Sequence, residues 1–387
     1  MTSTPNNNDN NSKEENESFL TQSFDKAESD NWKKDAKKSK QKRKMKKGLF
    51  ITFISLCVVI AMVVTSLFVL GFLGKGKLLN KDVNIDSNNE DAIIYGDSTI
   101  LYNGVLYEYN QDVTGMLFMG IDREELTENG SYGTNGQADT IMLVTVDTKT
   151  GKTFITAIPR DTVTGIDIYS TGGEFIKTEE KQICLAYAYG DGRELSCENT
   201  VKAVCELLLG MPVNTYLSAD YSLIEKLTNV FGEFSVVPNE SFEATKPHYS
   251  KVYKFEKDVP NKLTSDNVLA FLKYRGNNAD SSYLRMERQM NFLSGLVEAT
   301  INKTKTDISF PVSLFNMFAK ETVSNLSPNK ITFITSSVFS NRNNVELEFR
   351  KLEGEQIIGE EGLAEFHPDE TKLFELVLEL FYKPVTD

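Results

Sequence analysis

An apolar run without a single ionised side chain, residues 48–74, constrains the architecture of this 387-residue chain more than any other feature. The run reads GLFITFISLCVVIAMVVTSLFVLGFLG, and about 20 apolar residues suffice for a helix to cross a bilayer. A cleavable signal peptide has an apolar region of only about 7–15 residues, and here a long polar segment precedes the run. The sequence therefore predicts a single transmembrane helix at 48–74.

The charges next to this run predict its orientation. Ten Lys and Arg residues lie between residues 33 and 47, and such basic segments stay on the cytoplasmic side of the membrane. We expect residues 1–47 to be a disordered basic cytoplasmic tail, residues 75–97 an extracellular tether and residues 98–387 an extracellular domain. The predicted location is the cell membrane, with one pass, the N-terminus in the cytoplasm and the C-terminal domain outside.

The predicted extracellular part is strongly acidic. The chain carries 42 Lys and Arg and 55 Asp and Glu, of which residues 1–47 hold 12 and 8 and residues 48–74 hold none. Residues 75–387 therefore hold 42 − 12 = 30 basic and 55 − 8 = 47 acidic side chains, a net charge of −17. Binding to duplex nucleic acid needs a basic face, so the composition argues against a nucleic-acid partner.

Strand patterns alternate with helical patterns throughout the predicted extracellular domain. MLFMGID (116–122) is typical of a buried strand, and residues 139–147 and 152–159 are typical of an antiparallel pair. The dipeptide Asn103-Gly104 between two short β-prone runs predicts a type I′ hairpin. Helical periodicity appears in several later segments, from residue 182 onward. The expected fold is α/β or α+β around one sheet.

Three cysteines, Cys184, Cys197 and Cys205, lie in the predicted extracellular part, where disulfides can persist. Cys184 and Cys197 flank the turn-like YGDGRE and are the first candidate pair, and Cys197 with Cys205 is the second. One cysteine is left over in either case. A zinc site is disfavoured because no Cys-x-x-Cys motif occurs and the two histidines stand apart.

Two aspartates lie at the edges of predicted strands. Asp122 ends the strand in GIDRE, and Asp139 begins the next strand in GQADT. If these strands are neighbours, both carboxylates meet at one rim of the sheet. That arrangement suits Mg²⁺, which takes few carboxylates together with water and phosphate oxygens. The alternative is that each aspartate is an ordinary strand-end or turn residue.

The motif IPRDT, residues 158–162, places Arg160 and Asp161 where a strand must end, because Pro159 cannot donate to a sheet ladder. Ligands of open α/β sheets gather beyond the carboxyl ends of strands. A second basic cluster, in FLKYRGNNADSSYLRMERQ, contains Lys273, Arg275, Arg285, Arg288 and Gln289. Arginine binds phosphate through paired hydrogen bonds, so both segments are candidate anion sites. A solvated salt bridge and a solvated helix face are the alternatives.

Together these motifs resemble the LytR–CpsA–Psr family. GID, the ADT that opens the next strand, IPRDT, the helical AYAYG and RMERQ follow the family's order, and the chain closes with FYKPV. The resemblance covers about residues 112–300, with 301–387 as a C-terminal extension, and implies a central mixed sheet flanked by helices. It also implies a membrane-anchored phosphotransferase that moves a glycopolymer from a polyprenyl-pyrophosphate carrier onto peptidoglycan, attaching teichoic acid or capsular polysaccharide.

The resemblance also implies roles for individual residues. Asp122 and Asp139 would hold Mg²⁺ against the pyrophosphate. The residues implied in pyrophosphate binding are Gln137, Arg160, Lys273, Arg275, Arg285, Arg288 and Gln289. A hydrophobic cavity for the polyprenyl tail is expected between the sheet and the helices, lined partly by the helices of residues 182–230.

The chain departs from the family pattern at positions that bear on catalysis. Gln137 stands where the family usually has arginine, and Lys273 replaces the first arginine of R-x-R, which keeps the charge but loses the planar fork. Ser282 stands where the family has an aspartate, a candidate general base. Either Asp280 or Asp161 serves as the base, or no base is needed. These departures leave an alternative function open, a catalytically weak lipid-pyrophosphate-binding scaffold or regulator of cell-envelope assembly.

Overall fold

The computed structural model describes residues 85–86, 89, 91–95, 98–123, 126, 132–246, 249–274, 276, 281–307, 309–340, 347–360 and 362–385. All of these residues belong to one compact unit, Val69–Asp387. The predicted cytoplasmic tail, the predicted transmembrane helix and most of the predicted tether lie outside the described residues. Within the described residues, no helix combines the length and the apolar character needed to cross a membrane.

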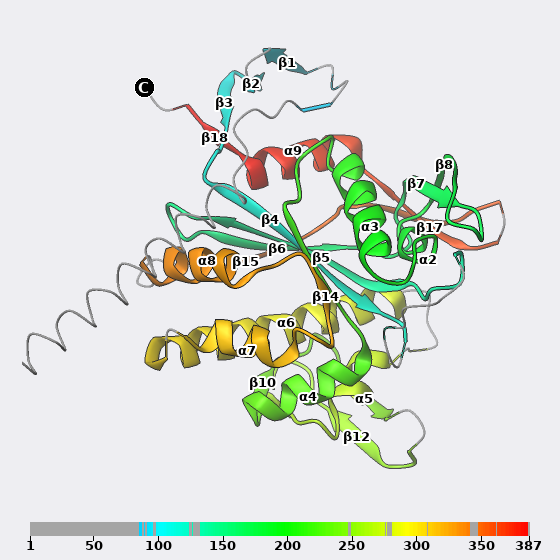
Figure 1. The fold of residues 1–387 in the computed structure, drawn as a ribbon, viewed down its shortest axis with the longest axis vertical. Coiled ribbons are helices and arrows are strands. Elements are labelled where there is room, and N and C mark those ends of the chain that lie inside the picture. Colours follow the sequence, from blue (N-terminus) through cyan, green and yellow to red (C-terminus); the bar gives the residue numbers. More distant parts are fainter. Residues whose placement is uncertain are drawn as a thin grey trace, which may run out of the picture. The chain divides into compact units, whose positions relative to one another are not determined.

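A mixed six-stranded sheet forms the centre of the described chain (Figure 1). Its spatial order is β14 (Val323–Ser324), β9 (Thr215–Ala219), β4 (Val113–Ile121), β5 (Ala138–Asp147), β6 (Thr153–Ile158) and β15 (Leu347–Lys351). Strands β4, β5 and β6 are antiparallel neighbours, whereas β9 runs parallel to β4 and β15 parallel to β6. The predicted buried strand and antiparallel pair are confirmed, and β6 ends before Pro159 as expected.

Helices cover both faces of this sheet (Figure 1). One face carries α2 (Leu185–Ala188), α3 (Glu194–Leu207) and α9 (Glu370–Phe381). The other carries α4 (Tyr221–Phe231), α5 (Val268–Lys273), α6 (Ser281–Thr306) and α7 (Phe310–Phe318), and α8 (Pro328–Ser340) packs against α7. On the first face, Leu117 and Leu143 of the sheet share one apolar core with Val204 of α3 and Phe374 of α9. The fold is therefore mixed α/β, as predicted.

Shorter antiparallel sheets surround these layers. They are β1 (Ala92–Tyr95), β2 (Thr99–Tyr102) and β3 (Val105–Tyr109) with β18 (Tyr382–Pro384); β7 (Val163–Tyr169) with β8 (Phe175–Gln182); β10 (Phe234–Val236) with β13 (Asn261–Leu263); β11 (Phe242–Thr245) with β12 (Val252–Phe255); and β16 (Gly354–Ile358) with β17 (Ala364–Pro368). The β2–β3 turn has positive φ at Asn103 (49°) and Gly104 (77°), which confirms the predicted type I′ hairpin.

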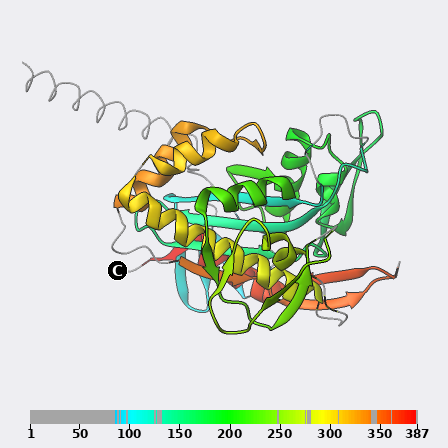
Figure 2. The same ribbon diagram turned by 90° about the horizontal axis from the view of Figure 1, so that it is seen from below.

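Residues 301–387, expected as a C-terminal extension, complete the domain. Strand β15 is part of the central sheet, α9 contributes to its core, and Tyr382 of β18 pairs with Tyr109 of β3. The hairpins β7–β8 and β16–β17 lie at the opposite end of the sheet from α7 and α8 (Figures 1 and 2). The C-terminal segment therefore reaches the sheet edge at which IPRDT follows β6.

Candidate active site

Asp139 occupies a β-bulge at the beginning of β5. Gly120 of β4 pairs with Thr140, but the next residue, Ile121, pairs with Ala138, so that the register skips Asp139. Side chains alternate between the two faces of a strand. Without the extra residue, Asp139 would lie opposite Ile121, where Ala138 now contributes to the apolar core. The bulge re-aims the carboxylate out of that core, as bulges next to functional sites do.

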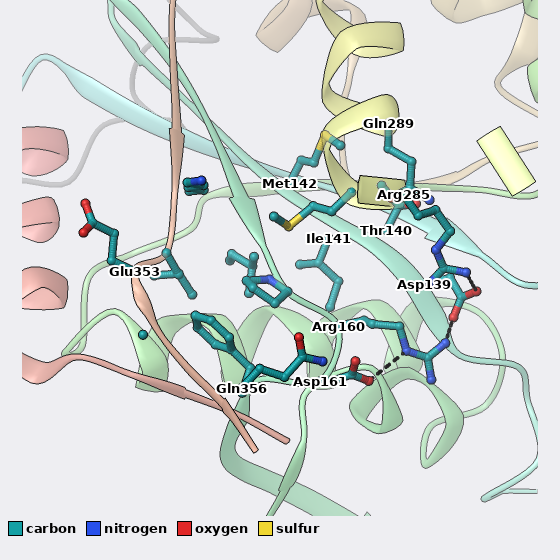
Figure 3. Close-up of a pocket in the computed structure, with 17 residues that line it drawn as sticks. Asp139, Thr140, Ile141, Met142, Arg160, Asp161, Arg285, Gln289, Glu353 and Gln356 are labelled. Atoms are coloured by element: carbon teal, nitrogen blue, oxygen red, sulfur yellow. Dashed lines mark hydrogen bonds and ion pairs between the residues drawn. The ribbon is translucent and has the colours of Figure 1, made fainter. Parts of the chain in front are cut away.

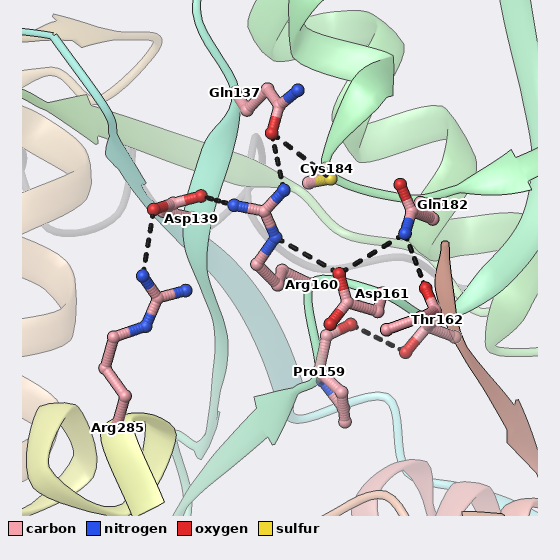
Figure 4. Close-up of polar contacts among 10 residues, drawn as sticks. Gln137, Asp139, Pro159, Arg160, Asp161, Thr162, Gln182, Cys184 and Arg285 are labelled. Carbon is pink, nitrogen blue, oxygen red and sulfur yellow. Dashed lines mark hydrogen bonds and ion pairs between the residues drawn. The ribbon is translucent and has the colours of Figure 1, made fainter. Parts of the chain in front are cut away.

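Arg160 is the centre of the polar network at the end of β6 (Figure 4). Its guanidinium donates to the Asp139 carboxylate, to the Gln137 amide oxygen and, from Nε, to Asp161 Oδ1 at 3.2 Å. The same Asp161 oxygen accepts from Gln182 Nε2 at 3.4 Å. The two charges that the sequence placed after the strand therefore lie in one network, together with Asp139 of the neighbouring strand.

Arg285 reaches the network from α6. Its Nη1 donates to Asp139 Oδ2 at 3.2 Å, so Asp139 bridges Arg285 and Arg160. Arg285 is 5% and Asp139 6% exposed, and buried charges persist in proteins when they are paired. Two guanidinium groups and the carboxylates of Asp139 and Asp161 balance one another in this network. A site of this kind can exchange a carboxylate partner for a phosphate oxygen without a large change in local charge.

The network forms one wall of a cavity of about 540 Å³ (Figure 3). Its lining includes Asp139, Arg160, Asp161, Arg285 and Gln289, so five of the predicted site residues are brought together. Arg285 and Gln289 are one helical turn apart on α6 and face the cavity together, as their spacing predicted. We call this space the polar cavity.

A second cavity of about 460 Å³ adjoins the polar cavity and shares Thr140, Met142 and Gln289 with it. Its other walls are almost entirely apolar and come from β4, β9, α4, α6, α7 and α8. We call this space the apolar cavity. An apolar cavity partly lined by the helices of residues 182–230 was expected. Helix α4 contributes to it, whereas α2 and α3 cover the other face of the sheet.

Asp122 lies next to Asp139 along the sheet edge. The backbone N–H of Asp122 donates to the carbonyl of Gln137, two residues before Asp139, at 3.0 Å. The Asp122 side chain is exposed, while that of Asp139 is engaged by the two arginines. No group of three or more His, Cys, Asp or Glu that could hold a metal occurs among the described residues. A pair of carboxylates on adjacent strands still fits Mg²⁺, which takes its remaining ligands from water and phosphate.

The structure directs two predicted pyrophosphate ligands away from the polar cavity. Lys273 Nζ lies 3.4 Å from the centre of the Tyr221 ring. Arg288 is 1% exposed and donates to the Glu240 carboxylate and to the carbonyl of Tyr274. Helical geometry contributes for Arg288: it directly precedes Gln289, about 100° away around the axis of α6, so the two side chains leave the helix in different directions. Burial lowers the pKa of Arg288, partly offset by Glu240.

Arg275, Asp280 and Ser282 complete the set of residues singled out around the basic cluster. Arg275 and Asp280 lie outside the described residues, and of Ser282 only the backbone, in the first turn of α6, is described. Asp161 is therefore the one of the two candidate bases whose surroundings are defined. Its Oδ1 takes both hydrogen bonds from Arg160 and Gln182, and no described residue donates to its Oδ2.

The predicted disulfides are wrong, because Cys184, Cys197 and Cys205 are all free thiols. Cys184 lies at the site, with Sγ 4.0 Å from the Gln137 amide oxygen, while Cys197 is buried in α3. Cys197 and Cys205 are both on α3, separated by eight residues or about 12 Å of helix, too far for a disulfide. Burial raises the pKa of Cys184 to about 11 and that of Cys197 to about 12.

Sequence reasoning missed the wall of the polar cavity that faces the arginines. This wall comes from the C-terminal segment and includes Lys351, Leu352, Glu353, Gly354, Gln356 and Phe366. The segment is bonded to the IPRDT motif, since the Phe366 N–H donates to the Asp161 carbonyl at 2.8 Å and Gln182 Nε2 also donates to the carbonyl of Ala364. About 190 residues separate the two along the chain, and no local pattern announces that they meet.

Comparison with known protein families supports the resemblance on which these site residues were predicted. The signature of the LytR_cpsA_psr family matches residues 79–381, most of the chain. The protein belongs to the LytR_cpsA_psr family. The matched range begins before β1 and ends at the last residue of α9, so it includes the C-terminal segment that forms part of the cavity wall.

Two curated relatives of this LytR_cpsA_psr protein are polyisoprenyl-teichoic acid–peptidoglycan teichoic acid transferases. TagV of Bacillus subtilis (strain 168) is 24% identical over 303 residues, 77% of this chain and 71% of TagV. TagU of Bacillus licheniformis is 25% identical over 342 residues, 88% of this chain and 97% of TagU. The crystal structure of B. subtilis TagV superposes with a TM-score of 0.53 at 20% identity, covering 70% of this chain and 96% of TagV. The structural likeness shows a common fold.

Gln137 contributes a neutral partner to the network around Arg160. At the position where the resemblance leads us to expect arginine, the Gln137 amide oxygen accepts a hydrogen bond from Arg160. An arginine there would place a third cation beside Arg160 and Arg285. The glutamine therefore orients Arg160 and lowers the positive charge of the network by one unit.

Proposed function

We propose that the protein is a membrane-anchored, Mg²⁺-dependent phosphotransferase that moves a glycopolymer from a polyprenyl-pyrophosphate carrier onto peptidoglycan. It would act on the outer face of the membrane, with the helix of residues 48–74 as its anchor. The observation that carries the proposal is the direct junction of a cavity lined by arginines with a cavity lined by apolar side chains. Membership of the family and the activities named for TagU and TagV support it.

The two cavities match an amphiphilic donor with an anionic head and a hydrocarbon tail. Apolar ligands bind in largely preformed apolar pockets with a few placed polar groups. Here Gln289 and Thr140 lie at the junction, where the tail would meet the pyrophosphate. Arg160 and Arg285 lie on the polar side, and their guanidinium groups can each present paired donors to phosphate oxygens. A soluble nucleotide has no hydrocarbon tail that could fill the apolar cavity.

In the proposed reaction, a hydroxyl oxygen of peptidoglycan attacks the phosphorus that carries the glycopolymer. The new P–O bond joins the polymer phosphate to peptidoglycan, the bond to the second phosphate breaks, and polyprenyl phosphate leaves. Phosphoryl transfer depends mainly on positioning and charge neutralisation. Arg160 and Arg285 would orient the pyrophosphate and stabilise the charge that develops on the leaving phosphate.

The hydroxyl proton needs an acceptor, and Asp161 is placed to serve. Its Oδ1 is held by Arg160 and Gln182, which fixes the carboxylate plane, while its Oδ2 accepts no hydrogen bond from a described residue. Asp161 also lines the polar cavity. Asp280, the other candidate, remains a prediction from the sequence.

Asp122 and Asp139 would hold Mg²⁺. When bound, the ion would supply positive charge to the pyrophosphate oxygens. Asp139 would then release one of its arginine partners, and that guanidinium would turn to the substrate. Such an exchange would account for a carboxylate that lies between two arginines.

The second candidate function is a binding protein without turnover. It is favoured by the complete pairing of Asp139 with Arg160 and Arg285 and by the neutral Gln137 in the same network. In that case the protein would hold the lipid-linked polymer as a scaffold or regulator of envelope assembly.

The two candidates differ in one product. The full-length chain in detergent micelles is incubated with a polyprenyl-pyrophosphoryl glycan, Mg²⁺ and peptidoglycan oligomers, and polyprenyl phosphate release is followed. The transferase proposal expects release that requires the oligomer and disappears in Asp139→Ala. Retained donor binding with no release above the Asp139→Ala background would instead establish the binding protein. Chelation of Mg²⁺ tests the metal separately.

A further inference from the structure

The polar cavity is larger than a pyrophosphate requires. At about 30 Å³ for a water-sized group, its volume of about 540 Å³ holds well over a dozen such groups. A pyrophosphate has nine non-hydrogen atoms and would occupy the side lined by Arg160 and Arg285. The rest of the cavity is bounded by the C-terminal wall, which carries different chemistry.

The C-terminal wall offers hydrogen-bonding groups but no guanidinium group. Gln356 of β16 presents an amide, Glu353 presents a carboxylate, and Phe366, the cross-strand partner of Gln356, presents an aromatic ring. The Gln356 amide points into the cavity toward Asp161 (Figure 3). It makes no side-chain hydrogen bond with another residue in the described parts of the chain, so both its donor and its acceptor are available to a ligand.

The wall carries one cation, Lys351, and one anion, Glu353, so its charges offset each other and supply no net attraction for a second anion. A carboxylate at Glu353 repels phosphate, whereas amide and carboxylate groups beside an aromatic ring bind hydroxyl groups and the apolar face of a ring. The neutral, hydroxyl-rich group that must lie next to a pyrophosphate in this reaction is a sugar.

We propose that Gln356, Glu353 and Phe366 form a subsite for the sugar ring adjacent to the transferred phosphate. The proposal rests on the phosphotransferase function. Two sugars have the required chemistry, the first sugar of the donor polymer and the sugar of peptidoglycan whose hydroxyl attacks. In either case the subsite selects the partner of the reaction, while the arginines bind the pyrophosphate that all donors share.

The subsite is connected to Asp161 by hydrogen bonds. The Phe366 N–H is bonded to the Asp161 carbonyl, and Gln182 donates to both the Asp161 carboxylate and the Ala364 carbonyl. A sugar bound against β16 would therefore press on the strand pair that holds Asp161. Occupation of the subsite and placement of the candidate base are coupled through these bonds.

The hairpin itself supplies a matched control. Residues alternate between the two faces of a strand, so Gly354 and Gln356 line the cavity and Glu355 does not. All five residues of β16 are exposed. Substitution of Gln356 or Glu355 therefore leaves the apolar core intact, and both variants should fold like the wild type.

The test measures binding of two probes to the full-length chain in detergent micelles, farnesyl pyrophosphate and its conjugate with N-acetylglucosamine. If the donor sugar occupies the subsite, Gln356→Ala weakens the sugar-bearing probe about five- to tenfold, the loss of about one hydrogen bond. Its affinity for farnesyl pyrophosphate stays within about twofold of wild type. Glu355→Gln changes neither. Glu353→Gln tests the carboxylate in the same way.

If the acceptor sugar occupies the subsite, both probes bind Gln356→Ala normally, and the KM for peptidoglycan oligomers rises by a similar factor at unchanged kcat. Either result supports the subsite and names its occupant. Equal behaviour of Gln356→Ala, Glu353→Gln and Glu355→Gln in all three measurements would overturn it. Two other results would instead overturn the proposed function. In the first, the wild-type chain binds neither probe. In the second, Arg160→Ala binds both probes with wild-type affinity.

Discussion

Replacement of the buried Arg288 separates a structural role from a ligand-binding role. In Arg288→Met the side chain keeps most of its apolar contacts but loses its charge. The carbonyl of Tyr274 loses its hydrogen-bond donor, which costs about 1–3 kcal/mol for a buried group. The guanidinium carbon also lies 4.9 Å and 5.1 Å from the ring centres of Phe242 and Tyr274. Loss of these contacts costs about another 0.5–2 kcal/mol.

Loss of the ion pair with Glu240 lowers the free energy of unfolding by a smaller amount. The Glu240 side chain is 25% exposed, so water can hydrate the charge that Arg288 leaves behind, and the pair is worth less than a fully buried one. We therefore expect the free energy of unfolding to fall by about 2–4 kcal/mol in Arg288→Met. Because Arg288 does not line the polar cavity, the folded variant should bind farnesyl pyrophosphate with an affinity within about threefold of wild type.

The measurement is denaturant unfolding of the full-length chain in micelles, followed by circular dichroism without ligand, together with probe binding at low temperature. Arg285→Met is the control, since its guanidinium lies in the cavity and its loss should reduce affinity at least tenfold. The reasoning fails if Arg288→Met unfolds like the wild type and binds the probe as poorly as Arg285→Met. That outcome would return Arg288 to the pyrophosphate site.

Three further outcomes test other parts of the site. Arg160→Ala should lower kcat by about 10²–10³, the loss typical of one preorganised donor, and turnover equal to wild type would remove Arg160 from the mechanism. Val297→Trp fills the apolar cavity and should weaken farnesyl pyrophosphate about tenfold while inorganic pyrophosphate binds normally; Val252→Trp, on an exposed strand, is the control. Burial raises the pKa of Cys184 from 9.0 to about 11, so the folded state favours the neutral thiol, and its contribution to stability is intact below pH 9 and lost as pH rises to about 11. Unfolding measured across this window should show a steeper decline for the wild type than for Cys184→Ala, and identical slopes would contradict the assignment.

Much of the central sheet was predictable because its signals are local. The run MLFMGID and the strand that ends at Pro159 are recognisable from hydrophobicity and from the missing proline N–H. The same holds for Asn103-Gly104, whose conformational preference alone selects the turn. Strand β15 was not predictable, because its parallel partner β6 lies far away along the chain and parallel pairing leaves no turn signature.

The residues of the site also fall into those that local signals predicted and those that they did not. Asp139, Arg160 and Asp161 were identifiable as charges at strand ends, and Arg285 with Gln289 by helical spacing. For Arg288 the sequence showed a cation in a basic cluster but not its carboxylate partner, Glu240, which only the structure reveals. The cysteines were paired by the turn between them, although their spacing along the chain says nothing about the direction of their side chains.

For the proposed polyprenyl donor, the volume of the apolar cavity limits how much of the tail could be enclosed. At about 30 Å³ per carbon-sized group, a cavity of about 460 Å³ holds about fifteen carbons. That is the length of three isoprene units. The remaining units of a longer polyprenyl chain would extend past the mouth and stay among the surrounding acyl chains. A protein of this kind would work on its donor without extracting it, gripping the end of the tail nearest the pyrophosphate and leaving the rest dissolved in the bilayer.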